Sequence, residues 1–163
     1  MAQLLTDAAA SVQTAARAVA LWRDVAELKA EQLADLPTAV ACLRRALRIA
    51  PQDPVTIERL AQLYERDGQP MESIRLLRTL AGLKVDSSTL LKTHLQLARL
   101  ASDVLHQPAE SLEHLRSALR IAPDNADALE QLAAHLEDVG DVEEAQRTLD
   151  KLSSVTSDDP ERQ

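Results

Sequence analysis

A six-residue phrase occurs twice in this chain, 72 residues apart. Ala46–Pro51 and Ala118–Pro123 both read ALRIAP, and residues 39–68 share 13 identities in 30 positions with residues 111–140. A chain built from like units buries its core by stacking them, and it usually presents an extended surface rather than a pocket. The repeat therefore constrains the architecture and indicates a general role in binding.

Composition favours a helical core over a sheet. Of the 163 residues, 45% are hydrophobic but only 1% are aromatic, so Leu, Ala, Val and Ile must fill the interior. The three glycines and the lack of an alternating β-branched pattern argue against strands. Apolar residues instead recur at i, i+3, i+4 and i+7, which predicts an all-α fold with helices near 7–34, 36–50, 53–67, 70–82, 87–106, 108–121, 125–139 and 142–154.

Turn and cap residues divide these helices at matching places in the two copies. Gly68 and Gly140 stand where a helix must end, and a left-handed residue is easiest with glycine. Asp53 and Asn125 are predicted N-caps of the helices that follow them. The pattern predicts four antiparallel hairpins near 7–50, 53–82, 87–121 and 125–154, in one domain over 1–155 followed by a polar tail at 156–163.

Small residues mark where the two helices of each hairpin should cross. One lies midway along the first helix of each predicted hairpin and another lies on its second helix, and small side chains that face each other let two helix backbones approach closely. The positions are Ala26, Ala61, Ala98 and Ala133 on first helices, and Ala39, Ser73, Ser111 and Ala145 on second helices.

These features resemble the tetratricopeptide repeat family, whose unit is a helix hairpin of about 34 residues with small residues at the crossing. The best matches are LAQLYERDGQPMES at Leu60–Ser73 and LAAHLEDVGDVEEA at Leu132–Ala145. The first and third hairpins depart from the pattern, since they carry an extra turn residue and lack the turn glycine. The resemblance implies an α-solenoid of about four hairpins, a right-handed superhelix with a concave groove lined mainly by first helices.

By the same resemblance, the groove would recognise a peptide, a helix or a folded protein. The family pattern implies a groove that runs from mixed charge through basic to acidic. Its expected lining residues are Val55, Glu58, Gln62, Glu65, Arg66, Lys92, Leu95, Arg99, Ser102, Asp127, Glu130, Ala134 and Asp138.

The charge is unevenly distributed between the halves. The net charge is −8; residues 1–81 hold 10 basic and 10 acidic side chains, and residues 82–163 hold 8 and 16. An acidic second half disfavours nucleic acid and anionic membranes as partners and favours a basic or mixed-charge protein. No signal peptide and no apolar run of about 20 residues is recognisable, so we expect a cytoplasmic protein.

No catalytic or metal-binding motif is recognisable. The four histidines lack metal-site spacing, and Glu110 with His114 would need further ligands. Cys42 has no activating partner in the sequence, and no glycine-rich phosphate loop exists. We therefore expect no enzyme activity, no cofactor and no metal. An arginine stripe on second helices is interpreted as a solvated outer face: Arg44, Arg45, Arg48, Arg116 and Arg120.

The leading functional hypothesis is a non-catalytic adaptor that binds another protein. The alternative is a structural segment that continues in a longer repeat array or self-associates end to end.

Overall fold

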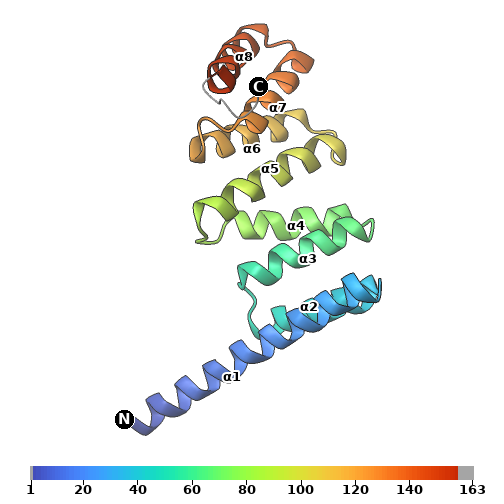
Figure 1. Ribbon diagram of the computed structural model, residues 1–163, viewed down its shortest axis with the longest axis vertical. Coiled ribbons are helices and arrows are strands. Elements are labelled where there is room, and N and C mark those ends of the chain that lie inside the picture. The colour runs from blue at the N-terminus through green and yellow to red at the C-terminus, as the bar shows by residue number, and fades with distance from the viewer. Residues whose placement is uncertain (1, 158–163) are drawn as a thin grey trace. The chain divides into compact units, whose positions relative to one another are not determined.

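The structure is a computed structural model that describes residues 2–157, with side chains from residue 13 onward. Within this range every regular element is a helix, so the all-α expectation is correct (Figure 1). The elements are α1 (Ala2–Glu27), the π-helical turn η1 (Leu28–Gln32), α2 (Leu36–Ile49), α3 (Pro54–Arg66), α4 (Pro70–Ala81), α5 (Ser87–Asp103), α6 (Pro108–Ile121), α7 (Ala126–Val139) and α8 (Val142–Ser157).

Helix boundaries differ from the expected ones mainly at the two ends. The first helix begins at Ala2 rather than near residue 7, and its last part is the π-helical turn η1. The last helix extends to Ser157, so it includes the first two residues of the expected polar tail. Residues 158–163 of that tail lie outside the described residues.

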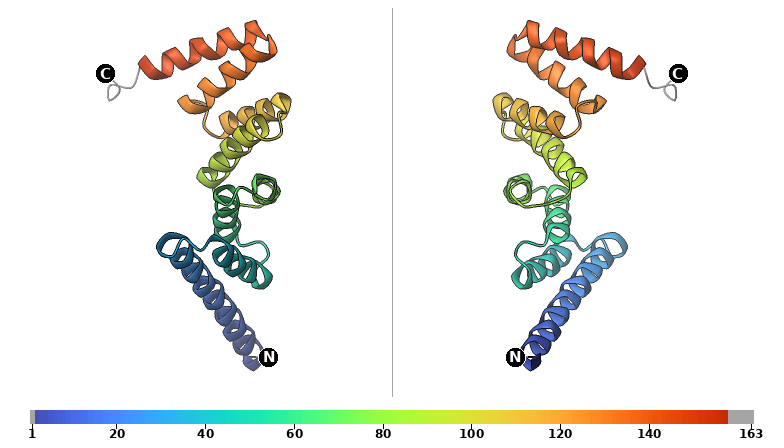
Figure 2. Two further views of the ribbon diagram at one scale, coloured as in Figure 1. Left: turned by 90° about the vertical axis from the view of Figure 1, so that its right-hand side faces the viewer. Right: turned by 90° about the vertical axis from the view of Figure 1, so that its left-hand side faces the viewer.

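Neighbouring helices pair as antiparallel hairpins, and the hairpins form two compact units. The first unit, Met1–Leu83, contains the α1–α2 and α3–α4 hairpins, and the second, Lys84–Gln163, contains α5–α6 and α7–α8 (Figures 1 and 2). Each unit therefore corresponds to one copy of the 72-residue repeat.

The small residues that the sequence places at the hairpin crossings are all buried. All eight are at most 2% exposed: Ala26, Ala39, Ala61, Ser73, Ala98, Ser111, Ala133 and Ala145. Since each has no more than one heavy atom beyond Cβ, the paired backbones can lie close together at these points.

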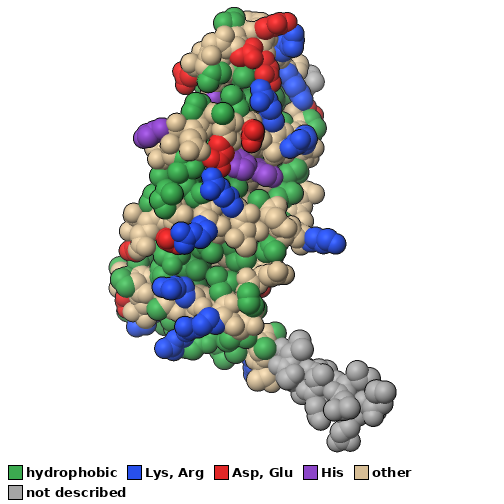
Figure 3. All heavy atoms as spheres, turned by 180° about the vertical axis from the view of Figure 1, so that it is seen from behind, with side chains coloured by type: hydrophobic (Ala, Val, Ile, Leu, Met, Phe, Trp, Pro, Cys, Tyr) green, Lys and Arg blue, Asp and Glu red, His purple; other side chains and the backbone are tan. Residues whose placement is uncertain are grey.

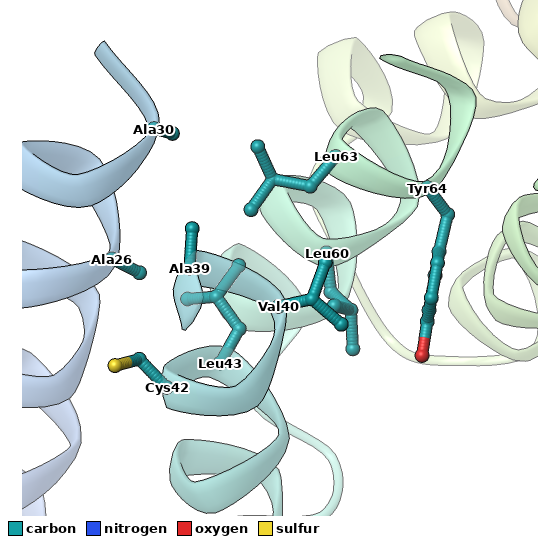
Figure 4. Close-up of a cluster of buried hydrophobic side chains, with 9 residues drawn as sticks. All are labelled: Ala26, Ala30, Ala39, Val40, Cys42, Leu43, Leu60, Leu63 and Tyr64. Carbon is teal, nitrogen blue, oxygen red and sulfur yellow. The ribbon is translucent and has the colours of Figure 1, made fainter. Parts of the chain in front are cut away.

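The first unit's core is built around these crossings. Ala26 and Ala30 point from the first hairpin's leading helix toward Leu43 of α2 and Leu63 of α3 (Figure 4). Trp22 packs against this cluster, and the Arg45 guanidinium lies 5.0 Å from the centroid of its ring. Trp22 therefore contributes to the core of the first unit.

Four helix-ending turns each contain a residue in the left-handed backbone conformation. The four residues form two pairs, and the members of each pair lie 72 residues apart in the sequence. Gly68 (φ 74°) and Gly140 (φ 81°) end α3 and α7 as expected. The first and third hairpins lack a glycine there, and they use Ala34 (φ 51°) and His106 (φ 53°) instead. The backbone amides that follow, Asp35 N and Gln107 N, donate to Lys29 O at 2.8 Å and Ala101 O at 2.9 Å. The extra turn residue thus makes a wider helix-ending turn, and a residue with a Cβ is held in a conformation that favours glycine.

We expect Ala34→Gly to stabilise the first unit by about 1 kcal/mol. The Ala34 side chain is exposed, so its removal costs little packing, while glycine relieves the left-handed strain. Urea unfolding followed by Trp22 fluorescence measures the effect. The matched control is Ala41→Gly, at an exposed site within α2, which should destabilise by about 1 kcal/mol. A destabilised Ala34→Gly protein would contradict the strain argument.

Candidate functional site

The first helices of the first unit enclose a hollow between α1 and α3. Its volume is about 280 Å³, and its floor is apolar, with Ala26, Ala30, Leu43 and Leu63. The hollow exists because two of these four side chains are alanines, which leave space above the floor. Charged and polar side chains form the rim: Arg23, Glu27, Glu31, Arg59, Gln62 and Arg66.

Ion pairs connect the two sides of this hollow. Arg59 Nη1 lies 2.9 Å from Glu27 Oε2, and Arg66 pairs with Glu31. These four side chains are between 42% and 61% exposed, so each pair contributes at most about 1 kcal/mol to stability. Because the pairs are exposed and weak, an incoming charged group could exchange with them at low cost. The rim therefore suits a partner of mixed charge.

The expected groove residues of α3 lie in different surroundings. Gln62 and Arg66 line the hollow, and Val55 is 42% exposed. Glu58 is half-buried. The Glu65 carboxylate accepts a hydrogen bond from Ser73 Oγ at 3.1 Å, so it is engaged with α4 inside its own hairpin.

In the second unit, the expected groove residues are exposed or half-buried. Leu95 packs against the core cluster that contains Ala98 and Leu115. Arg99 lies 3.9 Å from Asp103, one turn further along α5. Ser102 is half-buried, and the exposed members are Lys92, Arg99, Asp127, Glu130, Ala134 and Asp138. The four on α7 form a predominantly acidic helix face.

Sequence reasoning missed the charged residues that α1 and η1 contribute to the hollow. Arg23, Glu27 and Glu31 follow one another at intervals of one helical turn, and Arg59 and Arg66 oppose two of them from α3. The four-residue spacing of charges was visible in the sequence. Their pairing required knowledge of which hairpins are neighbours.

A histidine pair joins α5 and α6 within the third hairpin. His94 Nδ1 and His114 Nδ1 are 3.3 Å apart, and Glu110 Oε1 lies 3.6 Å from His114 Nε2. Sequence spacing linked only Glu110 with His114. No group of three or more potential ligands with metal-site geometry exists among the described side chains. Burial lowers the pKa of His94, and the nearby charges of His114 and Arg120 lower it further.

Acidification should therefore weaken the second unit. The folded chain holds the pKa of His94 below its unfolded value of about 6.5, so the unfolded chain binds more protons between the two values. The contribution to stability is present above about pH 6.5 and is lost as the pH falls through the folded pKa. Urea unfolding by circular dichroism between about pH 7.5 and 5 measures it, and His94→Gln should reduce the slope. His106→Gln, at an exposed turn site, is the control; equal reductions for both would refute the assignment.

Comparisons with known proteins identify the repeat type. Residues 105–163 match a sequence model described as "Tetratricopeptide repeat". No curated protein sequence matches the chain. Among the described residues, no helix is both long enough and apolar enough to cross a bilayer.

Solved structures with this fold cover most of the chain. A crystal structure of MamA protein has a TM-score of 0.73 at 19% identity, over 87% of this chain and 75% of MamA. A putative kinesin light chain from Podospora anserina with nearly identical TPR-like repeats has a TM-score of 0.65 at 21% identity, over 85% and 75%. YrrB, described as a TPR protein with an unusual peptide-binding site, has a TM-score of 0.67 at 16% identity, over 82% of this chain and 66% of YrrB.

At these identities the structures support the fold alone, while the sequence match in the second unit supports the family directly. The chain therefore has the fold of solved tetratricopeptide-repeat structures, with four helix hairpins in the described residues, and residues 105–163 match the model of that family.

Proposed function

We propose that this protein is a non-catalytic adaptor that binds a segment of another protein on its first helices. The observation that carries the proposal is the hollow between α1 and α3, with its apolar floor and weakly paired charged rim. A floor of this kind accepts an apolar side chain, and the rim charges set which partner residues fit beside it.

Partner chemistry follows from the charges around the candidate residues. The α3 positions offer both signs, and the α7 positions are mainly acidic, which favours a partner with basic or mixed charge. Nucleic acid and anionic membranes fit this distribution poorly. A cytoplasmic location is part of the proposal. YrrB, described as having an unusual peptide-binding site, is a precedent for peptide recognition on this fold.

The test begins with affinity capture of partners, followed by titration of the captured protein against variants. Glu27 and Glu31 lie one helical turn apart on the rim of the hollow. Glu27→Lys with Glu31→Lys should weaken binding by about tenfold or more, because both carboxylates lie on the proposed surface. Circular dichroism confirms that the variant is folded.

A matched control changes the same charges on second helices. Glu113→Lys with Asp150→Lys alters two exposed acids of α6 and α8 and should leave the affinity nearly unchanged. Loss of binding in this control, together with normal binding by the first-helix variant, would overturn the proposed surface while leaving the fold intact.

A second candidate function is a structural segment that self-associates. An exposed apolar stripe runs along α1 and η1. It consists of Leu21, Val25 and Leu28, which are 59%, 38% and 44% exposed. On α8, Val142 is 73% and Leu149 is 36% exposed. Stacked repeats bury such faces against a neighbouring repeat. Sedimentation at several concentrations tests this function: a monomer at all concentrations excludes it, and Leu21→Glu with Leu28→Glu should dissociate an assembly.

A further inference from the structure

The second helices of the first unit form an unusually basic surface. Helices α2 and α4 carry five arginines and one glutamate, whereas the equivalent α6 and α8 carry four basic and five acidic side chains. Arg44, Arg45, Arg48, Arg75 and Arg78 make up the basic set. In the lower half of Figure 3, blue side chains surround green hydrophobic areas, with few acidic side chains between them. The basic character is local, because the first half of the sequence has no net charge.

An open groove of about 590 Å³ lies between α2 and α4. Its apolar part consists of Leu47, Leu60, Leu76 and the ring of Tyr64. Its polar part is made mostly of donors, since Arg44, Arg48, Arg75 and Gln69 accompany a single acid, Glu72. The groove therefore combines an apolar floor with a positive rim, and it involves other helix pairs than the α1–α3 hollow.

The equivalent arginine in the second unit shows what such a site binds. Arg116, which corresponds to Arg44, donates from Nε to Glu144 Oε1 at 3.2 Å and from Nη2 to Glu144 Oε2 at 2.6 Å. This two-bond arrangement is the preferred geometry between a guanidinium and a carboxylate. In the second unit, the chain thus supplies its own carboxylate to this arginine.

One substitution between the copies explains why the first unit does not do the same. In the second unit, Arg147 pairs with Glu143, which leaves Glu144 available for Arg116. Met71 replaces Glu143 in the first unit. Arg75, the counterpart of Arg147, therefore pairs with Glu72 at 3.0 Å, and Glu72 does not reach Arg44.

As a result, two arginines of the groove are left without an acidic partner. Arg44 and Arg48 are exposed, lie one turn apart on α2, and have no hydrogen bond or ion pair with any other described side chain. The Tyr64 hydroxyl likewise has no hydrogen-bond partner within the described part of the chain.

We propose that the α2–α4 groove binds an acidic segment of a partner protein. One carboxylate of that segment bonds to Arg44 as Glu144 bonds to Arg116, and a second, one helical turn away, meets Arg48. An aliphatic side chain between them covers Leu47, Leu60 and Leu76. The inference is independent of the first-helix surface, since it concerns a different helix pair and a partner of opposite charge.

The probe is a fluorescein-labelled helical peptide with glutamates one turn apart and leucines on the same face. Its control replaces every glutamate by glutamine. Anisotropy titration of the full chain should show binding of the first peptide only, with an affinity that falls as salt is added. Arg44→Gln with Arg48→Gln should reduce the affinity about tenfold or more, and Arg116→Gln with Arg120→Gln should leave it unchanged.

Exchanging the residue that differs between the copies is the sharper test. Met71→Glu should weaken peptide binding several-fold, because the new carboxylate pairs with Arg75 and releases Glu72 to Arg44. Met71 is 55% exposed, so the variant should remain folded by circular dichroism. Glu143→Met should have the reverse effect in the second unit and create a second binding site.

Three outcomes would overturn the proposal. The first is unchanged affinity in the Arg44→Gln, Arg48→Gln variant with a normal circular dichroism spectrum. The second is equal affinity for the glutamine peptide. The third is equally tight binding of a single-stranded oligonucleotide with the same dependence on Arg44 and Arg48, which would show a general anion surface. Weaker binding by Met71→Glu and a second site in Glu143→Met would support it.

Discussion

Ala133→Arg is expected to unfold the second unit, or to lower its free energy of unfolding by about 4 kcal/mol or more. Ala133 is 2% exposed at the crossing of α7 with α8, where Ala145 is also 2% exposed. A guanidinium and its stem have no space between two helix backbones, and overpacking costs about 1–3 kcal/mol. Burying an unpaired charge costs about 3–5 kcal/mol, so the side chain must separate the helices to reach water.

The adjacent residue provides the matched control. Ala134 is exposed on the same helix, so Ala134→Arg should change stability by less than about 0.5 kcal/mol. Circular dichroism melting and hydrogen exchange of the α7 and α8 amides measure both variants. Tryptophan and tyrosine fluorescence would miss the effect, because Trp22 and Tyr64 both lie in the first unit. Equal melting temperatures for the two variants would show that the register of this hairpin is wrong.

The fold was predictable because its determinants are local or repeated. Helical spacing, the cap residues Asp53 and Asn125, and the turn glycines act within a few residues of themselves. The small residues at the crossings act between helices that are neighbours in the sequence. The duplication also provides a second copy of each signal. A pattern that occurs in both copies is therefore a stronger predictor of structure than a pattern that occurs in only one.

Features that depend on particular tertiary neighbours were not predictable in this way. The missing glycines marked the turns of the first and third hairpins as unusual. They did not predict that Ala34 and His106 adopt the left-handed conformation, which follows from the wider turn. The contact of His94 with His114 depends on rotation of α5 against α6. The sequence predicted a stripe of five arginines, but it did not show that Arg116 is the member of that stripe that pairs with a carboxylate among the described residues.

Asp53→Ala is expected to destabilise the first unit by about 3 kcal/mol, which is large for one partly exposed side chain. Asp53 Oδ2 accepts a hydrogen bond from Thr56 N at 3.0 Å, so its loss removes the N-cap of α3, at a cost of about 1 kcal/mol. The same carboxylate accepts a hydrogen bond from the Thr56 hydroxyl, which is fully buried. Leaving that hydroxyl unsatisfied costs about 1–3 kcal/mol. Arg23 Nη1, 3.4 Å from Asp53 Oδ2, also loses its partner.

The second copy separates these contributions. Asn125 caps α7 through Ala128 N at 2.8 Å, but residue 128 has no hydroxyl and Leu95 stands at the position equivalent to Arg23. Asn125→Ala should therefore cost only the cap, about 1 kcal/mol. In a Thr56→Ala background, Asp53→Ala should also lower the free energy of unfolding by only about 1 kcal/mol, because no buried hydroxyl is left unpaired. Urea unfolding followed by Trp22 fluorescence measures the Asp53 variants. If the full 3 kcal/mol persists in the Thr56→Ala background, the cap or the Arg23 pair, and not the buried hydroxyl, accounts for the excess.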